Sequence, residues 1–229
     1  MKNKIAQSLF EKYACSHIIN TLLPFITDQR KARIESVIQY RLDSITLALE
    51  NPADINNALA CVRTCEALGV STIHIISPEH DARYIHTITQ SAFYWVEIIF
   101  HPHLQHFLQA MKNENRIIAG AVLNANTPLS ALSIEKPLCL LIGNEHRGLS
   151  DEAKAQCDYI FSIPMCGMID SFNLSVAAAI SLFDVTQRKR LQLKNKTDLN
   201  EKTATHLRAK YYLNSVSARA ASELLKKLK

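Results

Sequence analysis

The chain of 229 residues has only five glycines, and it contains neither a G-x-G-x-x-G nor a Walker A sequence. The absence of both patterns disfavours a Rossmann dinucleotide site and a P-loop. No apolar run approaches the roughly 20 residues needed to cross a bilayer. The start, Met1-Lys2-Asn3-Lys4, also lacks the apolar region of a signal peptide. We therefore expect a cytoplasmic protein without a membrane-spanning segment.

The six cysteines form no C-x-x-C pair and no zinc-type spacing with histidine. Most have apolar neighbours, which indicates buried free thiols in a reducing compartment and no catalytic thiol. Among the nine histidines, His101, His103 and His106 come nearest to a metal-ligand spacing. We interpret them as a surface cluster on a loop and a helix, and we expect no metal site.

Hydrophobic residues make up 48% of the chain, enough for one substantial core with some extra elements. Short apolar runs alternate with helix-like patterns, which is typical of an α/β fold with a mostly parallel sheet covered by helices on both faces. The expected strands cover 45–49, 70–76, 95–100, 116–123 and 137–142. The expected helices cover 5–38 with a break near Pro24 and Thr27, 55–68, 84–92, 102–113, a segment from Ser150, and one or two segments after Gln187.

Charge is strongly segregated along the chain. Residues 1–41 hold seven basic and three acidic side chains, and residues 188–229 hold twelve and three. Residues 42–187 hold seven basic and fifteen acidic side chains. We therefore predict a central domain at 42–187 with basic helical extensions at 1–41 and 188–229. Such ends can grip a polyanion such as a nucleic acid, although solvated basic helices would look the same.

The most informative segment runs from Ile163 to Ala179. It reads as a strand end, a loop containing Gly167, and an alanine-rich helix, with a Ser-x-Asn pair where the helix starts. Helix starts present unpaired backbone N–H groups and favour Ser or Asn as caps. The segment therefore indicates a backbone-lined ligand pocket, and an ordinary strand-to-helix turn is the alternative reading.

Two further blocks accompany this segment. The first, residues 57–69, reads NALACVRTCEALG, and the second, residues 141–150, reads LIGNEHRGLS. In this order and spacing the three blocks resemble the motifs of the SPOUT class of RNA methyltransferases, and within it the SpoU/TrmH family. The resemblance covers about residues 33–190.

The resemblance implies an α/β fold with a trefoil knot in its C-terminal half. It also implies S-adenosylmethionine held in the knot, no metal, and a homodimer whose active site is shared between subunits. The implied activity is methyl transfer to the ribose 2′-hydroxyl of guanosine 18 in the tRNA D-loop. The alternatives are another RNA site, in 23S rRNA or at the tRNA wobble nucleotide, and a non-catalytic knotted RNA-binding protein.

By resemblance, the catalytic residues are Arg63, Glu145, Ser171, Asn173 and Asn57. A guanidinium resists deprotonation, so electrostatic stabilisation of the developing oxyanion suits Arg63 better than a role as general base. Asn57 lies six residues before Arg63, close enough on a helix to flank the same site, although helix capping is an equal alternative. A purely structural role is the alternative for Glu145, and capping alone is the alternative for Ser171 or Asn173.

The resemblance also assigns residues to cofactor and RNA. The expected cofactor-binding positions are Gly120, Gly143, Ile163, Met165 and Phe172, with much of the binding by main-chain groups. The expected tRNA contacts are Arg188 and Arg190, for which ordinary solvated charge is the alternative.

Overall fold

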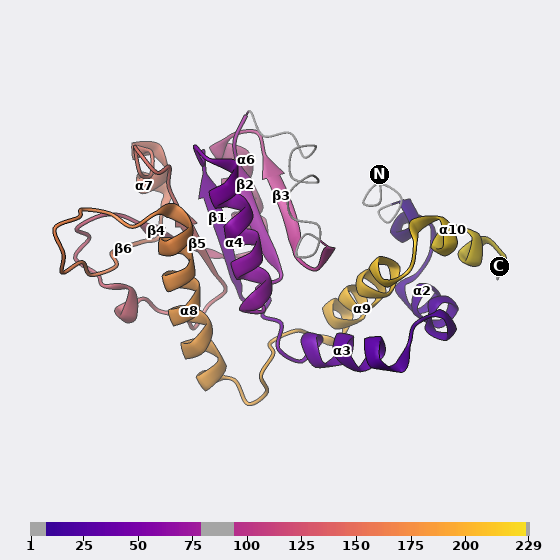
Figure 1. The fold of residues 1–229 in the computed structure, drawn as a ribbon. Helices are drawn as coiled ribbons and strands as arrows, with labels where there is room; N and C mark the ends of the chain where they lie inside the picture. The colour runs from indigo at the N-terminus through magenta and orange to yellow at the C-terminus, as the bar shows by residue number, and fades with distance from the viewer. Residues whose placement is uncertain (1–7, 79–93, 228–229) are drawn as a thin grey trace. The chain divides into compact units, whose positions relative to one another are not determined.

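A computed structural model describes residues 8–78 and 94–227 of the chain (Figure 1). The chain divides into two compact units, one formed by 42–195 and the other by 1–41 together with 196–229. The predicted boundary after Gln187 falls inside a helix that continues to Gln192. Within the described ranges, no helix is long and apolar enough to cross a membrane.

The larger unit is built on a six-stranded sheet in which every pairing is parallel, as the sequence predicts. The strand order is β3-β2-β1-β5-β4-β6. The strands are β1 (Ile45–Glu50), β2 (Thr72–Ile76), β3 (Glu97–His101), β4 (Ile117–Ala121), β5 (Leu138–Ile142) and β6 (Tyr159–Phe161). The carboxyl ends of all six strands therefore lie at one edge of the sheet.

Both faces of the sheet are buried, because side chains alternate between two apolar clusters. Ile45, Leu47 and Leu49 of β1 belong to the cluster that includes α4 (Ile55–Ala67) and α8 (Leu174–Gln192). Ala48, on the opposite face, belongs to the cluster that includes α6 (Leu104–Asn113) and α7 (Asp151–Gln156). The expected cover of helices on both faces is thus confirmed.

Most helix boundaries follow local capping chemistry that is visible in the sequence. Ser150 begins α7, because its hydroxyl oxygen accepts a hydrogen bond from the N–H of Ala153 at 3.1 Å. Gly69, at φ +77°, ends α4: its N–H binds Glu66 O, and the N–H of Val70 binds Cys65 O. The predicted break near Pro24 and Thr27 is present, between α2 (Cys15–Leu22) and α3 (Asp28–Ile38). The predicted helix at 84–92 lies outside the described residues.

The smaller unit is helical. It contains α2, the short 3-10 helix η1 (Leu23–Phe25), α3, α9 (Glu201–Ser215) and α10 (Ala218–Lys227). Helix α9 packs on α2 and α3, and the guanidinium of Arg208 on α9 binds the carboxylate of Glu35 on α3 through two bonds of 2.6 and 2.8 Å. The two ends of the chain, predicted as separate extensions, therefore fold against each other.

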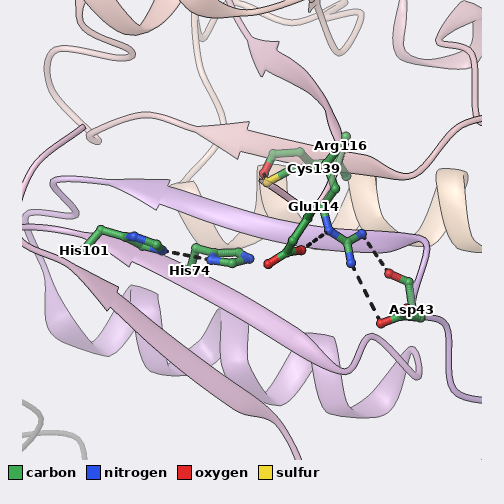
Figure 2. A network of polar contacts seen from close by, with 7 residues as sticks. Asp43, His74, His101, Glu114, Arg116 and Cys139 are labelled. Atoms are coloured by element: carbon green, nitrogen blue, oxygen red, sulfur yellow. Dashed lines mark hydrogen bonds and ion pairs between the residues drawn. The ribbon is translucent and has the colours of Figure 1, made fainter. Parts of the chain in front are cut away.

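Two buried imidazoles and one exposed imidazole form a chain on the α6 face of the sheet. His74 Nδ1 lies 3.0 Å from His101 Nε2 (Figure 2). His101 Nδ1 in turn lies 2.8 Å from His106 Nδ1. His74 and His101 are 0% and 1% exposed. The expectation of a surface cluster is therefore wrong for His101, because it is the last residue of β3 and points into the apolar layer with Phe107. Among the described residues, no set of three side chains could hold a metal ion.

Candidate active site

A pocket of about 420 Å³ opens where β4, β5 and β6 end. Open α/β sheets bind ligands at this edge, outside the carboxyl ends of their strands. The pocket is lined by 121–123 after β4, the loop 142–149 after β5, residues around Ile163 after β6, and the start of α8. Three segments far apart in the sequence thus converge because parallel strands end side by side.

The loop after β5 is folded back tightly on itself. Asn144 and Gly148 exchange two backbone hydrogen bonds of 2.8 and 3.0 Å. A Cβ on Gly143 would lie 2.2 Å from the backbone of Gly148 and Leu149, so only glycine fits at this position. Gly143 is therefore required by packing within the loop that lines the pocket.

Three of the five predicted catalytic side chains form one hydrogen-bonded cluster. Asn57 Nδ2 donates to Glu145 Oε1 at 2.8 Å, and Asn173 Nδ2 donates to Asn57 Oδ1 at 3.1 Å. Asn57 belongs to α4, and its capping alternative fails because Asp54 caps that helix. The structure thus brings one residue from each of the three sequence blocks together.

Both carboxylate oxygens of Glu145 accept hydrogen bonds. Its Oε2 accepts from the N–H of Ala53 at 2.7 Å, and its Oε1 accepts from Asn57 and, at 3.4 Å, from the N–H of Asp54. Partial burial raises the pKa of Glu145, but these hydrogen bonds outweigh it and hold the pKa below its usual value. The carboxylate is therefore ionised at neutral pH and suits an orienting or electrostatic role, since it has no proton to give.

Asn173 both caps helix α8 and donates a hydrogen bond to Asn57. Its Oδ1 accepts hydrogen bonds from the N–H and the hydroxyl of Ser175 at 2.9 and 2.6 Å and so begins α8, while its Nδ2 reaches Asn57. Ser171 lines the pocket two residues earlier. Capping alone therefore explains the hydrogen bonds of the Asn173 Oδ1 atom but not the hydrogen bond that its Nδ2 donates to Asn57.

Arg63 lies apart from this cluster. It is an exposed residue of α4, and it forms no hydrogen bond or ion pair within residues 8–78 and 94–227. Six residues on a helix correspond to about 600°, so Arg63 and Asn57 project in different directions. Within one chain, the structure does not bring the predicted catalytic arginine to the pocket.

Four of the five predicted cofactor positions line the pocket: Gly143, Ile163, Met165 and Phe172. Gly120 does not, although the next residue, Ala121, does. A Cβ on Gly120 would lie 2.7 Å from Cys157 Sγ and 2.8 Å from Leu149 Cδ1, so this glycine makes room for the packing of the pocket wall. The sequence analysis missed Ala121, Val122 and Leu123, although the end of a predicted parallel strand marks such positions.

The two predicted RNA-binding arginines have partners within the fold. Arg188 binds Asp184 Oδ2 at 2.8 Å and the carbonyl oxygens of Leu132 and Leu129 at 2.8 and 3.1 Å. Arg190 Nη2 donates to Leu68 O at 2.6 Å. Both guanidiniums therefore already hold α8 in place.

Two of the buried cysteines are unreactive because their thiols remain protonated. All six cysteines are free, and Cys61, Cys65 and Cys139 are buried. Burial raises the pKa of Cys61 and of Cys139 to about 12, so both remain protonated at neutral pH.

A parallel α/β sheet with a pocket at its carboxyl edge, beside converging amide and carboxylate groups, is typical of proteins that bind a small molecule there. A family model described as the SpoU rRNA Methylase family matches residues 44–183. The chain belongs to this SpoU methylase family.

Two related proteins are similar to this chain over more than four fifths of its length. A tRNA (guanosine(18)-2'-O)-methyltransferase of Borreliella burgdorferi is 34% identical over 197 residues, 85% of this chain and 89% of that one. The solved A. aeolicus TrmH/SpoU tRNA modifying enzyme matches with a TM-score of 0.70 and 27% identity, over 82% of this chain and 98% of that chain.

For a third protein, the similarity concerns the fold only. The SpoU methyltransferase AviRb from Streptomyces viridochromogenes, solved in complex with the cofactor AdoMet, matches with a TM-score of 0.59 and 22% identity. The match covers 64% of this chain and 58% of that chain.

Proposed function

We propose that this chain is an S-adenosylmethionine-dependent methyltransferase that modifies the ribose 2′-hydroxyl of guanosine 18 in tRNA. One observation carries the proposal. The loop 142–149 lines a pocket at the sheet edge and also contributes Glu145 to the cluster with Asn57 and Asn173. The family and the activity of the Borreliella burgdorferi relative indicate which chemistry that geometry serves.

The pocket residues fit S-adenosylmethionine. Ligand pockets for small molecules span about 300–1,000 Å³ and are mainly apolar with a few polar groups, and this one has about 420 Å³. Ile163, Met165 and Phe172 provide apolar surface, while Gly143 allows the loop backbone that lines the pocket to fold tightly against Gly148 and Leu149. When bound, the cofactor supplies an electrophilic methyl group on a sulfonium.

The residues of the chain act by placement and charge. The residues that line the pocket would hold S-adenosylmethionine next to the ribose, and the cofactor would supply the methyl group that the 2′-oxygen takes up. In-line positioning lowers the barrier substantially, because it removes the cost of bringing the reactants together. Asn57, Glu145 and Asn173 orient the ribose, and Arg63 stabilises the developing oxyanion.

We further propose a homodimer with a shared active site. Val176, Ile180 and Phe183 recur at helical spacing on α8, and Val176 and Phe183 are 43% and 58% exposed. Tyr159 and Ile160 of β6 are also exposed apolar residues. Such surface is typical of a protein interface. In a dimer, the exposed Arg63 of one subunit is available to the pocket of the other.

A knot is part of the proposal. The segment 122–137 between β4 and β5 pairs with the residue after β6: Leu129 N–H binds Ser162 O at 2.8 Å, and Ser162 N–H binds Thr127 O at 2.9 Å. Helix α8 then returns to the same segment through Arg188 and through Lys189, whose Nζ binds Ile134 O at 2.9 Å. These contacts support passage of the chain end through that segment.

The smaller unit is proposed to bind tRNA. The two ends of the chain, 1–41 and 188–229, carry net charges of +4 and +9 while residues 42–187 carry −8, and Lys202 and Arg219 are exposed at the C-terminal end. Phosphate contacts add up and make binding dependent on salt. We also propose a cytoplasmic location, which the free thiols and the proposed binding of tRNA support.

The decisive experiment uses radiolabelled S-adenosylmethionine and total RNA from a strain that lacks the guanosine 18 methyltransferase. We expect label in tRNA, mapped to the 2′-oxygen of guanosine 18. Arg63→Ala should lose at least about 100-fold in kcat, the scale of a lost oxyanion donor. Lys112→Ala, an exposed cation on α6, should match the wild type. Label in 23S rRNA or at the wobble nucleotide would change the substrate, and no label in any RNA would favour a binding protein.

A further inference from the structure

A buried carboxylate lies behind the pocket loop. Glu50, the last residue of β1, is 4% exposed. Its Oε1 accepts a hydrogen bond from the hydroxyl of Ser150 at 2.6 Å, and its Oε2 accepts one from the backbone N–H of Ser150 at 2.9 Å. Both carboxylate oxygens are therefore committed to one residue, a hundred positions away in the sequence.

Ser150 marks the point where the pocket loop ends and α7 begins. Its hydroxyl donates to Glu50 and accepts from the N–H of Ala153, which fixes the direction of that proton. The residues just before it, Gly148 and Leu149, line the pocket. The position of Ser150 thus sets the position of the pocket wall.

The other end of the loop is held by the residue after Glu50. Asn144 Nδ2 donates to the carbonyl oxygen of Asn51 at 2.6 Å. Asn144 Oδ1 in turn accepts from the N–H groups of His146 and Arg147 at 2.9 and 3.2 Å. Two adjacent residues at the end of β1 therefore anchor both ends of the loop 144–150.

We propose that Glu50 is a positioning residue that holds the loop 144–150 in the conformation that binds S-adenosylmethionine. The inference rests on the proposed function. Hydrogen bonds accepted by a carboxylate, such as the two from Ser150, are stronger than those accepted by a neutral group. The double anchor keeps the loop ready for the cofactor, so that binding does not have to order it.

Glu50→Gln tests the anchor with little change of shape. The amide oxygen of glutamine can still accept from the N–H of Ser150, but its NH₂ group then faces the Ser150 hydroxyl, which can no longer donate there. The variant therefore loses the charged acceptor and the 2.6 Å hydrogen bond donated by that hydroxyl. We expect about tenfold weaker S-adenosylmethionine binding, as expected when hydrogen bonds to a charged acceptor are lost. Calorimetric titration of the purified full chain with S-adenosylmethionine measures this without tRNA.

Steady-state kinetics separate positioning from general damage. The KM for S-adenosylmethionine should rise about tenfold, in proportion to the loss of binding, while kcat and the KM for tRNA stay within about twofold. A fall in kcat together with a rise of similar size in the KM for tRNA would overturn the proposal, because both changes would indicate a disturbed fold. Wild-type affinity in a folded Glu50→Gln variant would overturn it as well.

Matched variants complete the test. Glu152→Gln removes the same charge from an exposed position on α7, where the side chain contacts Gln105, and should bind like the wild type. Ser150→Ala should weaken binding and Ser150→Thr, which keeps the hydroxyl, should restore it. This pair also decides the matter if Glu50→Gln does not fold: equal affinity of the two would sink the proposal.

Failure of the proposed function gives a different result. If the wild-type chain neither binds S-adenosylmethionine nor methylates RNA, the function itself is wrong. If the wild type does both and the Glu50 and Ser150 variants are unaffected, only the positioning role is wrong.

Discussion

Acidification should destabilise the larger unit through its buried imidazoles. His74 is fully buried, and its pKa falls from 6.5 to about 3, because burial disfavours the charged form and His101 and Arg116 add repulsion. The pKa of His101 falls to about 4, through burial and the neighbouring His106, although Glu114 opposes the change. Figure 2 shows His74 and His101 together with Arg116, Glu114, Asp43 and Cys139.

The sign of the effect follows from the two proton affinities. Between pH 6.5 and about 3 the imidazole of His74 is protonated in the unfolded chain but neutral in the folded chain. The free energy of unfolding is therefore undiminished above pH 6.5 and falls as the pH drops. At pH 5 the linkage relation gives a loss of about 2 kcal/mol for each imidazole, and about 4 kcal/mol as an upper limit for the pair. A typical domain has roughly 5–15 kcal/mol in total.

Urea unfolding at pH 7.5 and pH 5.0 measures this loss. The single tryptophan, Trp95, lies just before β3 in the same unit, so its fluorescence reports on the unfolding of that unit. The variant His74→Leu should lose about 2 kcal/mol less than the wild type between the two pH values. His146→Gln, which removes an exposed histidine, should keep the full loss. Equal pH dependence in His74→Leu and the wild type would refute the reasoning.

Two further predictions concern assembly and RNA binding. Phe183→Glu places a charge on the exposed apolar face of α8 and should convert a dimer to a monomer in sedimentation experiments and abolish methylation, whereas Phe25→Glu, with a similar exposed fraction, should stay dimeric. A dimeric, active Phe183→Glu variant would contradict the proposed interface. Lys202→Ser and Arg219→Ser should each reduce the slope of log affinity for tRNA against log salt by about 0.7–0.9, while Lys112→Ser leaves it unchanged; an unaltered slope in both would remove the smaller unit from the RNA-binding surface.

The sequence by itself determined how five of the six strands alternate with helices, because each of these strands is an apolar run and several helices begin at a visible cap. The range of the three-residue strand β6 was not predicted. Ser150 starts α7 and Gly69 ends α4, both through hydrogen bonds between near neighbours in the chain. The three sequence blocks likewise identified the pocket positions Gly143, Ile163, Met165 and Phe172. Local chemistry and resemblance were sufficient for these features.

Only the tertiary structure decided which side chains meet. Asn57, Glu145 and Asn173 join because β1 and β5 are paired neighbours and α4 packs on α8. The same packing commits Arg188 and Arg190 to carbonyl oxygens of the fold, and it turns His101 from an expected surface residue into a buried one. Glu50 was invisible as a site residue, because its significance depends on a partner a hundred residues away. Such contacts depend on strand order and register, which periodicity along the chain does not encode.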